Sequence, residues 1–128
     1  MVTPVAIGSR LIGGEAPCFV IAEAGVNHNG DVQLALDMID AATACGADAV
    51  KFQTFCADSL VTSKAPKASY QRGHTNDSET QYEILKRLEL DADAHRRLVE
   101  RCCARGIMFM SSAFDEGSID LLDELGVA

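Results

Sequence analysis

Short apolar runs alternate with longer amphipathic stretches along this 128-residue chain. The short runs predict three buried strands, at 18–22, 49–52 and 107–110. Apolar side chains recur at helical spacing in the stretches that follow, which predicts helices at 31–45, about 91–105 and 115–125. The order of a strand followed by a helix is typical of parallel strands covered by helices. Both a doubly wound sheet and part of a (β/α)8 barrel fit this order.

The N-terminal residues lie outside this repeat. Residues 5–7 and 10–12 flank Gly8-Ser9, a pattern that predicts a small β-hairpin. We therefore divide the chain into an N-terminal hairpin, 1–17, and a part built of strand–helix units, 18–128.

A long connection of about 25 residues, from 55 to 79, follows the second predicted strand. Loops of this length inside α/β units are uncommon and usually functional. Residues 59–76 contain no acidic side chain and carry basic or imidazole groups at Lys64, Lys67, Arg72 and His74. A positive loop beside a strand end suits an anionic ligand, and a solvated surface loop explains the same charges equally well. A helix predicted over 78–88, with a capping box at 78–81, ends the connection.

Composition narrows the class of protein. With 11 basic and 19 acidic residues the formal net charge is −8, which argues against a nucleic-acid partner. No apolar run approaches the length of a membrane span, and the first ten residues lack a signal-peptide pattern. The five cysteines are odd in number and form no Cys-x-x-Cys motif, so we expect small buried thiols rather than disulfides or a zinc site. These features predict a cytoplasmic protein without membrane contacts.

Polar side chains occur where the first two predicted strands end. Glu23 follows the apolar run 18–22, so we expect its carboxylate to be partly desolvated and suited to acid–base chemistry. Lys51 lies within a buried strand, where a charge is costly unless an anion or a carboxylate faces it. Strand alternation places Gln53 on the same side as Lys51. A buried ion pair between Glu23 and Lys51, without a catalytic role, is the alternative.

The serines and histidines give weaker signals. Ser111 and Ser112 end the third predicted strand, and beside a lysine their hydroxyls would form a cradle for phosphate or carboxylate. The histidines lack metal-ligand spacing, and we expect His95 on a helix surface and His28 in the turn that places Glu23. The sequence contains no Gly-x-Gly-x-x-Gly motif, phosphate-binding loop or Ser/His/Asp pattern. The residues alone therefore indicate an anion-binding α/β enzyme.

A set of segments stands in order along the chain: IAEAGVNHNGD, GADAVKFQTF, KAPKASYQ, QYEILKRLEL, and FMSSAFD followed by DLLDELGV. Together they resemble the sialic acid synthase family, which includes N-acetylneuraminate, legionaminic acid and pseudaminic acid synthases. The NHNGD and KAPK segments are closer to the first two branches. The resemblance covers about residues 5–128 and implies an incomplete TIM barrel, with about three of its eight parallel β/α units.

The resemblance implies a transferase that condenses phosphoenolpyruvate with an N-acetylmannosamine-type sugar and yields a nonulosonic acid and phosphate. Glu23 matches the family's catalytic carboxylate. Lys51 and Ser112 match residues that hold phosphoenolpyruvate, and Gln53 and Asn76 match residues near the acceptor sugar. A divalent metal, usually manganese, and a homodimer are also implied, with the metal ligands expected beyond the present residues.

Two features depart from the family pattern. Many relatives read STPF where this chain reads SSAF, so Ser112 keeps a hydroxyl while Ala113 lacks the rigidity of proline. A complete (β/α)8 barrel needs about 250 residues, so we interpret the chain as a fragment that is inactive and poorly stable alone. Another phosphoenolpyruvate-condensing ulosonate synthase is one alternative, and a non-catalytic sugar- or phosphate-binding remnant is another.

Overall fold

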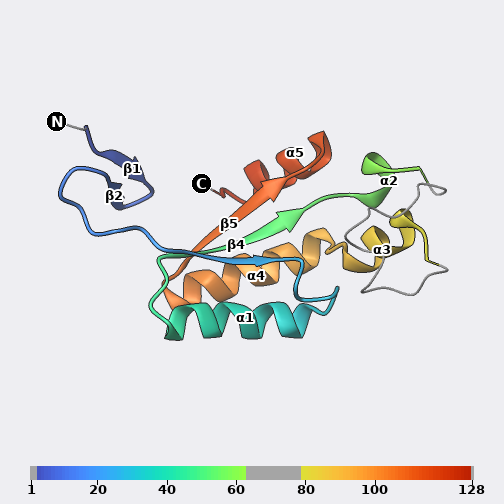
Figure 1. Ribbon diagram of the computed structural model, residues 1–128, viewed down its shortest axis with the longest axis horizontal. Helices are drawn as coiled ribbons and strands as arrows, with labels where there is room; N and C mark the ends of the chain where they lie inside the picture. The colour runs from blue at the N-terminus through green and yellow to red at the C-terminus, as the bar shows by residue number, and fades with distance from the viewer. Residues whose placement is uncertain (1–2, 63–78, 128) are drawn as a thin grey trace.

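Three parallel strands form the centre of the fold (Figure 1). The computed structural model describes residues 3–62 and 79–127. Strands β3 (Ile21–Gly25), β4 (Ala49–Thr54) and β5 (Met108–Ala113) lie in the order β3-β4-β5, each parallel to the next. Their order along the chain is also their order in space, as in a (β/α) barrel, whereas the order reverses in a doubly wound sheet. The structure therefore favours barrel units.

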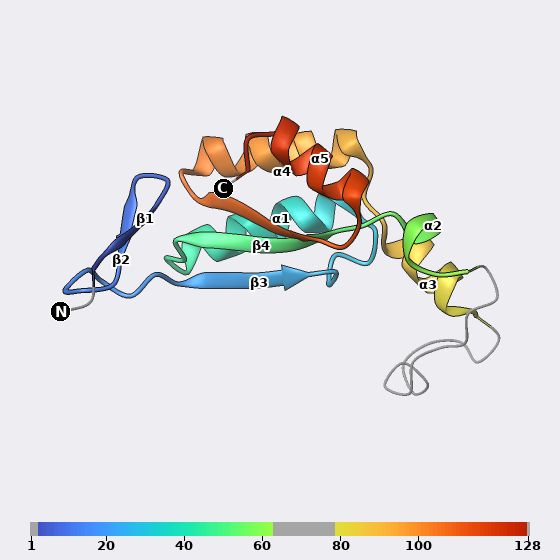
Figure 2. The ribbon, with the colours of Figure 1, turned by 90° about the horizontal axis from the view of Figure 1, so that it is seen from above.

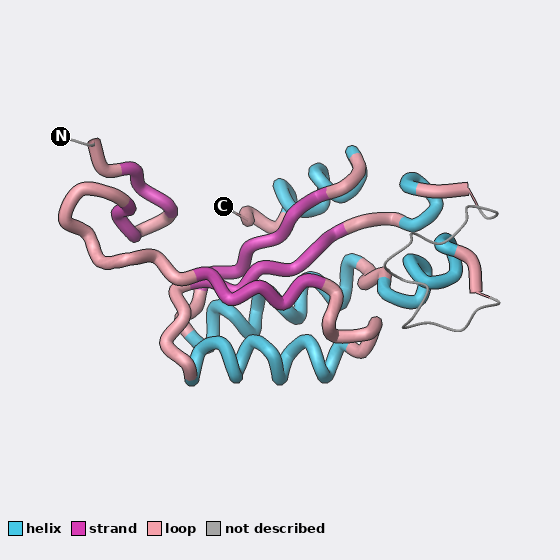
Figure 3. Tube along the Cα trace, viewed as in Figure 1, coloured by secondary structure: helices cyan, strands magenta, loops and turns pink. Residues whose placement is uncertain are grey.

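A helix follows each strand, and these helices share one face of the sheet. Helices α1 (Val32–Ala44), α4 (Ala92–Arg105) and α5 (Glu116–Glu124) lie on the same side of β3 and β4 in Figure 2, and Figure 3 shows the strands as a separate layer. The inward side chains of these helices and of the strands form one apolar cluster, which includes Leu36, Ile39, Val50, Phe52, Leu98, Phe109 and Leu122. The predicted fold class, parallel β/α units of an incomplete TIM barrel, is confirmed.

Side-chain caps determine where these helices begin. The carboxylates of Asp31, Asp91 and Asp115 accept hydrogen bonds from backbone N–H groups in the first turns of α1, α4 and α5. Loss of such a cap costs about 1 kcal/mol. Gly46 and Gly106 adopt positive φ just after α1 and α4, as expected for residues that end helices. The predicted bounds of these helices are therefore confirmed to within a residue.

Two shorter helices, α2 (Ala57–Leu60) and α3 (Gln81–Leu88), lie beyond the carboxyl ends of the strands (Figure 1). A capping box starts α3, but it is formed by Thr80 and Glu83 and not by residues 78–81 as predicted. The Thr80 hydroxyl accepts the Glu83 N–H, and the Glu83 carboxylate accepts the Thr80 N–H. The same sequence pattern occurs twice, two residues apart, and the prediction took the earlier match, whereas the helix starts at the later one.

The predicted N-terminal hairpin is confirmed. Strands β1 (Val5–Ile7) and β2 (Arg10–Ile12) are antiparallel and lie at the amino ends of the sheet strands (Figure 1). Arg10 forms an ion pair with Asp48, and the Asp48 carboxylate also accepts the Val20 N–H at 2.8 Å. Asp48 directly precedes β4, so it joins the hairpin to the sheet. The division of the chain after residue 17 stays a prediction.

The first strand of the sheet differs from the prediction in position and in burial. It begins at Ile21 and not at Cys18, and the residues Val20 and Ile21 are 50% and 43% exposed. The reason is its place, because in the described sheet β3 lies at the edge and pairs with β4 alone. The other two strands are longer than predicted and extend to Thr54 and Ala113.

The cysteines are less buried than predicted. Cys102 is buried, and its burial raises the pKa of its thiol to about 12, whereas Cys18, Cys45 and Cys103 are exposed. Helix and strand patterns alone placed them inward, but Cys18 lies before β3, and Cys45 and Cys103 lie at or near the C-terminal ends of α1 and α4. Within residues 3–62 and 79–127, no helix has both the length and the apolar character needed to cross a membrane.

Candidate functional site

The predicted site residues lie on the face of the sheet opposite the helices. Val50, Phe52 and Thr54 are buried toward the helices. Because side chains alternate along a strand, Lys51 and Gln53 point to the other face, which we call the open face. In the parallel register Lys51 pairs with Glu23 of β3, and Gln53 pairs with Ser112 of β5. Four of the five predicted site residues therefore share one face, and Asn76 lies outside the described residues.

Glu23 and Lys51 form an ion pair across β3 and β4. The distance from Glu23 Oε2 to Lys51 Nζ is 2.9 Å, and the two side chains are 54% and 35% exposed. The expected desolvation of Glu23 is therefore wrong for the described chain, because Glu23 lies on the edge strand. The alternative predicted this ion pair, and the pairing is confirmed, but the pair is accessible and not buried. The described arrangement is an accessible cation held by an accessible carboxylate.

Gly25 separates the Glu23 carboxylate from the Gln53 amide. A Cβ atom added at Gly25 would lie 3.6 Å from Glu23 Oε1 and 3.9 Å from Gln53 Nε2. The pairing of β3 with β4 is also irregular between Glu23 and Gly25. Gly25 has a φ of +55°, a conformation that glycine adopts without strain. The carboxylate and the amide thus flank a backbone stretch without a side chain, where a ligand can approach closely.

The two serines of β5 have different environments. Ser112 lies on the open face beside Gln53, in the strand and not at its end as predicted. Ser111 points toward the helices, where its Oγ lies 2.6 Å from Thr54 Oγ1. The prediction that both hydroxyls form one cradle is therefore wrong, because neighbouring residues of a strand face opposite sides. Ser112 alone joins Lys51 on the open face.

His28 is fully buried in the turn after β3. Its Nδ1 accepts the Gly30 N–H at 3.0 Å, which agrees with its expected role in ordering that turn. Burial, together with the nearby His95, lowers the pKa of His28. Since Nδ1 accepts, the neutral ring carries its proton on Nε2, for which the described residues provide no partner.

His95 contradicts the prediction of a surface residue. It is 1% exposed, and its ring contacts Thr54 of β4 and the backbone of Asp91. Burial lowers the pKa of His95 although the Asp91 carbonyl acts in the opposite direction. The helical pattern contained the signal, because His95 lies three residues before Leu98 and seven before Cys102 on the buried side of α4. Polarity alone had suggested exposure.

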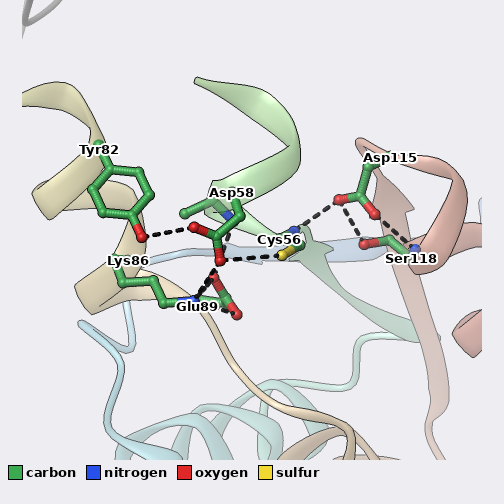
Figure 4. Close-up of polar contacts among 8 residues, drawn as sticks. Cys56, Asp58, Tyr82, Lys86, Glu89, Asp115 and Ser118 are labelled. Carbon is green, nitrogen blue, oxygen red and sulfur yellow. Dashed lines mark hydrogen bonds and ion pairs between the residues drawn. The ribbon is translucent and has the colours of Figure 1, made fainter. Parts of the chain in front are cut away.

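A polar network that the sequence did not reveal surrounds the carboxyl ends of β4 and β5 (Figure 4). The Asp115 carboxylate accepts the N–H of Cys56 at 2.7 Å, and so joins the turn after β5 to the end of β4. The Asp58 carboxylate accepts the Tyr82 hydroxyl at 2.7 Å and Lys86 Nζ at 3.2 Å. These two donors lower the pKa of Asp58. The network holds α2 against α3 next to the strand ends.

The implied metal is not supported by the residues that the structure describes. Within 3–62 and 79–127, no three or more His, Cys, Asp or Glu side chains are grouped so that they could hold a metal ion. The expectation that its ligands lie beyond this chain stays a prediction.

The fold and the open face together define a class of protein. Three successive parallel β/α units carry a lysine, a carboxylate, an amide and a hydroxyl on the side away from their helices, which in a barrel is the inner side. This is part of a (β/α) barrel whose inner wall carries an accessible cation, Lys51, with a carboxylate beside it.

The chain belongs to the NeuB family, whose model matches residues 38–128. It is 56% identical over 120 residues to N,N'-diacetyllegionaminic acid synthase of Legionella pneumophila, covering 94% of this chain and 34% of that protein. It is 39% identical over 118 residues to human N-acetylneuraminate-9-phosphate synthase, covering 92% of this chain and 33% of that protein. The resemblance noted in the sequence is confirmed, and the chain spans about a third of the length of these curated relatives.

A solved structure agrees with this assignment. The N-acetylneuraminic acid synthetase of Leptospira borgpetersenii, in complex with citrate, matches with a TM-score of 0.75 and 32% identity. The match covers 98% of this chain and 39% of that one.

Proposed function

We propose that this chain is the N-terminal part of a synthase that condenses phosphoenolpyruvate with an N-acetylated mannosamine-type sugar, releasing a nonulosonic acid and phosphate. Its membership of the NeuB family supports the reaction class. The higher identity to a legionaminic acid synthase than to a neuraminate-9-phosphate synthase supports an N,N'-diacetylated acceptor. The observation that carries the proposal is Lys51, an accessible cation on the open face with a carboxylate beside it.

The open face suits the charge of phosphoenolpyruvate, which carries a phosphate and a carboxylate. Lys51 is the cation that would bind one of these groups, and the Ser112 hydroxyl would donate a hydrogen bond to the same ligand. In the described chain Lys51 is paired with Glu23, so an incoming anion competes with that carboxylate.

Glu23 gains a second role when phosphoenolpyruvate binds Lys51 and displaces the Glu23 carboxylate from it. A carboxylate that loses its cation and faces a nearby anion binds a proton more readily. Glu23 can then hold or return a proton during the formation and collapse of the intermediate at C2 of phosphoenolpyruvate. The Gln53 amide lies on the far side of Gly25 from the ion pair, and we assign it, with Asn76, to the acceptor sugar.

The remaining parts of the proposal come from the resemblance. Manganese would polarise the sugar aldehyde, but its ligands would have to come from outside the described residues. A homodimer and a cytoplasmic location are proposed on the same ground.

The test is a phosphate-release assay on the full-length protein with phosphoenolpyruvate, manganese and a panel of sugars. We expect release that requires an N-acetylated mannosamine-type sugar and is fastest with the N,N'-diacetylated one. Release with another class of sugar would assign the protein to a different ulosonate synthase. A folded protein that binds phosphoenolpyruvate but releases no phosphate with any sugar would favour the non-catalytic alternative.

A further inference from the structure

A chain of hydrogen bonds, buried at Thr54 and His95 and partly buried at Ser111, runs behind the open face, on the side of the helices. His95 Nδ1 lies 2.9 Å from the Asp91 carbonyl oxygen, and His95 Nε2 lies 2.8 Å from Thr54 Oγ1. Thr54 Oγ1 in turn lies 2.6 Å from Ser111 Oγ. Thr54 and His95 are 2% and 1% exposed. The chain thus joins α4, β4 and β5 through their side chains.

The chemistry of one end, the Asp91 carbonyl, fixes the direction of every bond. The Asp91 carbonyl can only accept, so the neutral His95 ring carries its proton on Nδ1. His95 Nε2 must then accept the Thr54 hydroxyl proton, and the Thr54 oxygen accepts the proton of Ser111. The Ser111 hydroxyl is therefore committed to Thr54 and is not free to donate to a ligand.

The hydrogen-bond chain lies next to the site residues of β4 and β5. Thr54 follows Gln53 along β4, and Ser111 precedes Ser112 along β5. Gln53 and Ser112 are themselves paired across the two strands. The Thr54–Ser111 bond on one face therefore lies directly behind the Gln53–Ser112 pair on the other.

Polar side chains between the sheet and the helices are more costly than apolar ones if their only role is to fill space. A buried polar group left without a partner costs about 1–3 kcal/mol, whereas apolar side chains already fill the neighbouring core around Phe52 and Leu98. Hydrogen bonds restrict geometry more tightly than apolar contacts do, because they depend on both distance and angle. This favours a role in orientation.

We propose that Thr54, His95 and Ser111 are positioning residues that fix the spacing of Gln53 and Ser112 on the open face. The proposal rests on the proposed function, since it assigns the substrate-facing roles to Gln53 and Ser112. None of the three positioning residues touches the substrates.

The experiment compares four forms of the full-length protein: the parent, Thr54→Val, Thr54→Ser and Cys102→Ala. The valine keeps the shape of threonine and removes the hydroxyl, while the serine retains it. Cys102 is buried in α4, seven residues after His95, and is the control for loss of core packing alone. Each form is measured for thermal stability and for kcat and KM with both substrates.

We expect Thr54→Val to lower kcat/KM by about 10- to 100-fold, Thr54→Ser to restore most of it, and Cys102→Ala to lose stability while kcat/KM stays near that of the parent. If Thr54→Val does not fold, Ser111→Ala is used in its place, because that change removes only the last hydroxyl of the hydrogen-bond chain. A kcat/KM for the hydroxyl-free variants that matches Cys102→Ala at equal stability would overturn the proposal.

A second measurement does not depend on activity. In ¹⁵N-labelled protein near pH 7.5, His95 should show the Nδ1–H form and His28 the Nε2–H form. His95 in the Nε2–H form would refute the hydrogen-bond chain even if the protein proves to be a synthase. If His95 is in the Nδ1–H form but the protein has no synthase activity, the proposed function is rejected and the hydrogen-bond chain is still supported.

Discussion

Replacing Glu23 by glutamine separates the two roles that its carboxylate has on the open face. The variant keeps the size of the side chain and removes one negative charge next to Lys51, which lies 2.9 Å away. If Glu23 competes with an anionic ligand for Lys51, its neutralisation should strengthen the binding of phosphoenolpyruvate. If Glu23 also transfers protons, the same change should stop turnover. Binding and catalysis are then expected to change in opposite directions.

The exposure of the ion pair limits the gain in binding. Glu23 and Lys51 are 54% and 35% exposed, and accessible pairs of this kind contribute at most about 1 kcal/mol. A difference of about 1 kcal/mol corresponds to about a fivefold change in Kd. Loss of a positioned acid–base group costs about 10²- to 10⁴-fold in rate. We therefore expect the Kd for phosphoenolpyruvate to fall by up to about fivefold while kcat falls by at least about a hundredfold.

The assay pairs calorimetric titration of phosphoenolpyruvate with phosphate release in the full-length protein. Asp40→Asn is the matched control, because it also removes one carboxylate charge from an ion-pair cluster, formed with Arg101 and Arg105 between α1 and α4. The control should leave both the Kd and kcat unchanged. Unchanged kcat in Glu23→Gln would refute the catalytic role, and weaker binding of phosphoenolpyruvate would refute the competition for Lys51.

Three further outcomes follow from the described contacts. Lys51→Met should abolish detectable phosphoenolpyruvate binding and leave the urea midpoint equal or higher; retained binding would remove Lys51 from the site. Burial lowers the pKa of both His28 and His95, so the unfolded chain binds more protons below about pH 6.5 and the free energy of unfolding should fall from pH 7.5 to pH 5.5. Urea unfolding checks this, and a midpoint that does not change with pH would contradict it. Gly30→Ala should destabilise the fold by about 1–3 kcal/mol more than Gly46→Ala, since both glycines have positive φ but only a Cβ at Gly30 would collide with a backbone carbonyl of α3, that of Arg87. Equal losses in thermal unfolding would disprove the close contact.

Local signals account for the parts of the fold that the sequence predicted well. Asp31, Asp91 and Asp115 are capping residues whose function needs only the next three residues, so the helix starts could be read directly. The bounds of β3 could not be read in this way. Its exposure depends on which strand lies beside it, and that is a property of the assembled sheet.

The candidate site shows the same division between local and tertiary information. That Lys51 and Gln53 share a face follows from the alternation within one strand. The choice between Ser111 and Ser112 requires the register of β5 against β4, and a shift by one residue would exchange the two hydroxyls. From the sequence alone, both serines were therefore predicted to contact the ligand.

Several contacts hold the observed register. Phe52 and Phe109 stack with ring centroids 5.7 Å apart in the core, and the Thr54–Ser111 hydrogen bond lies next to them. A shift by one residue would turn Phe109 onto the open face and remove Ser111 from Thr54. The burial of His95, which polarity alone predicted wrongly, belongs to the same arrangement, since its ring accepts the Thr54 proton. The residues that decide which serine faces the ligand are thus located on the side of the sheet that the ligand does not reach.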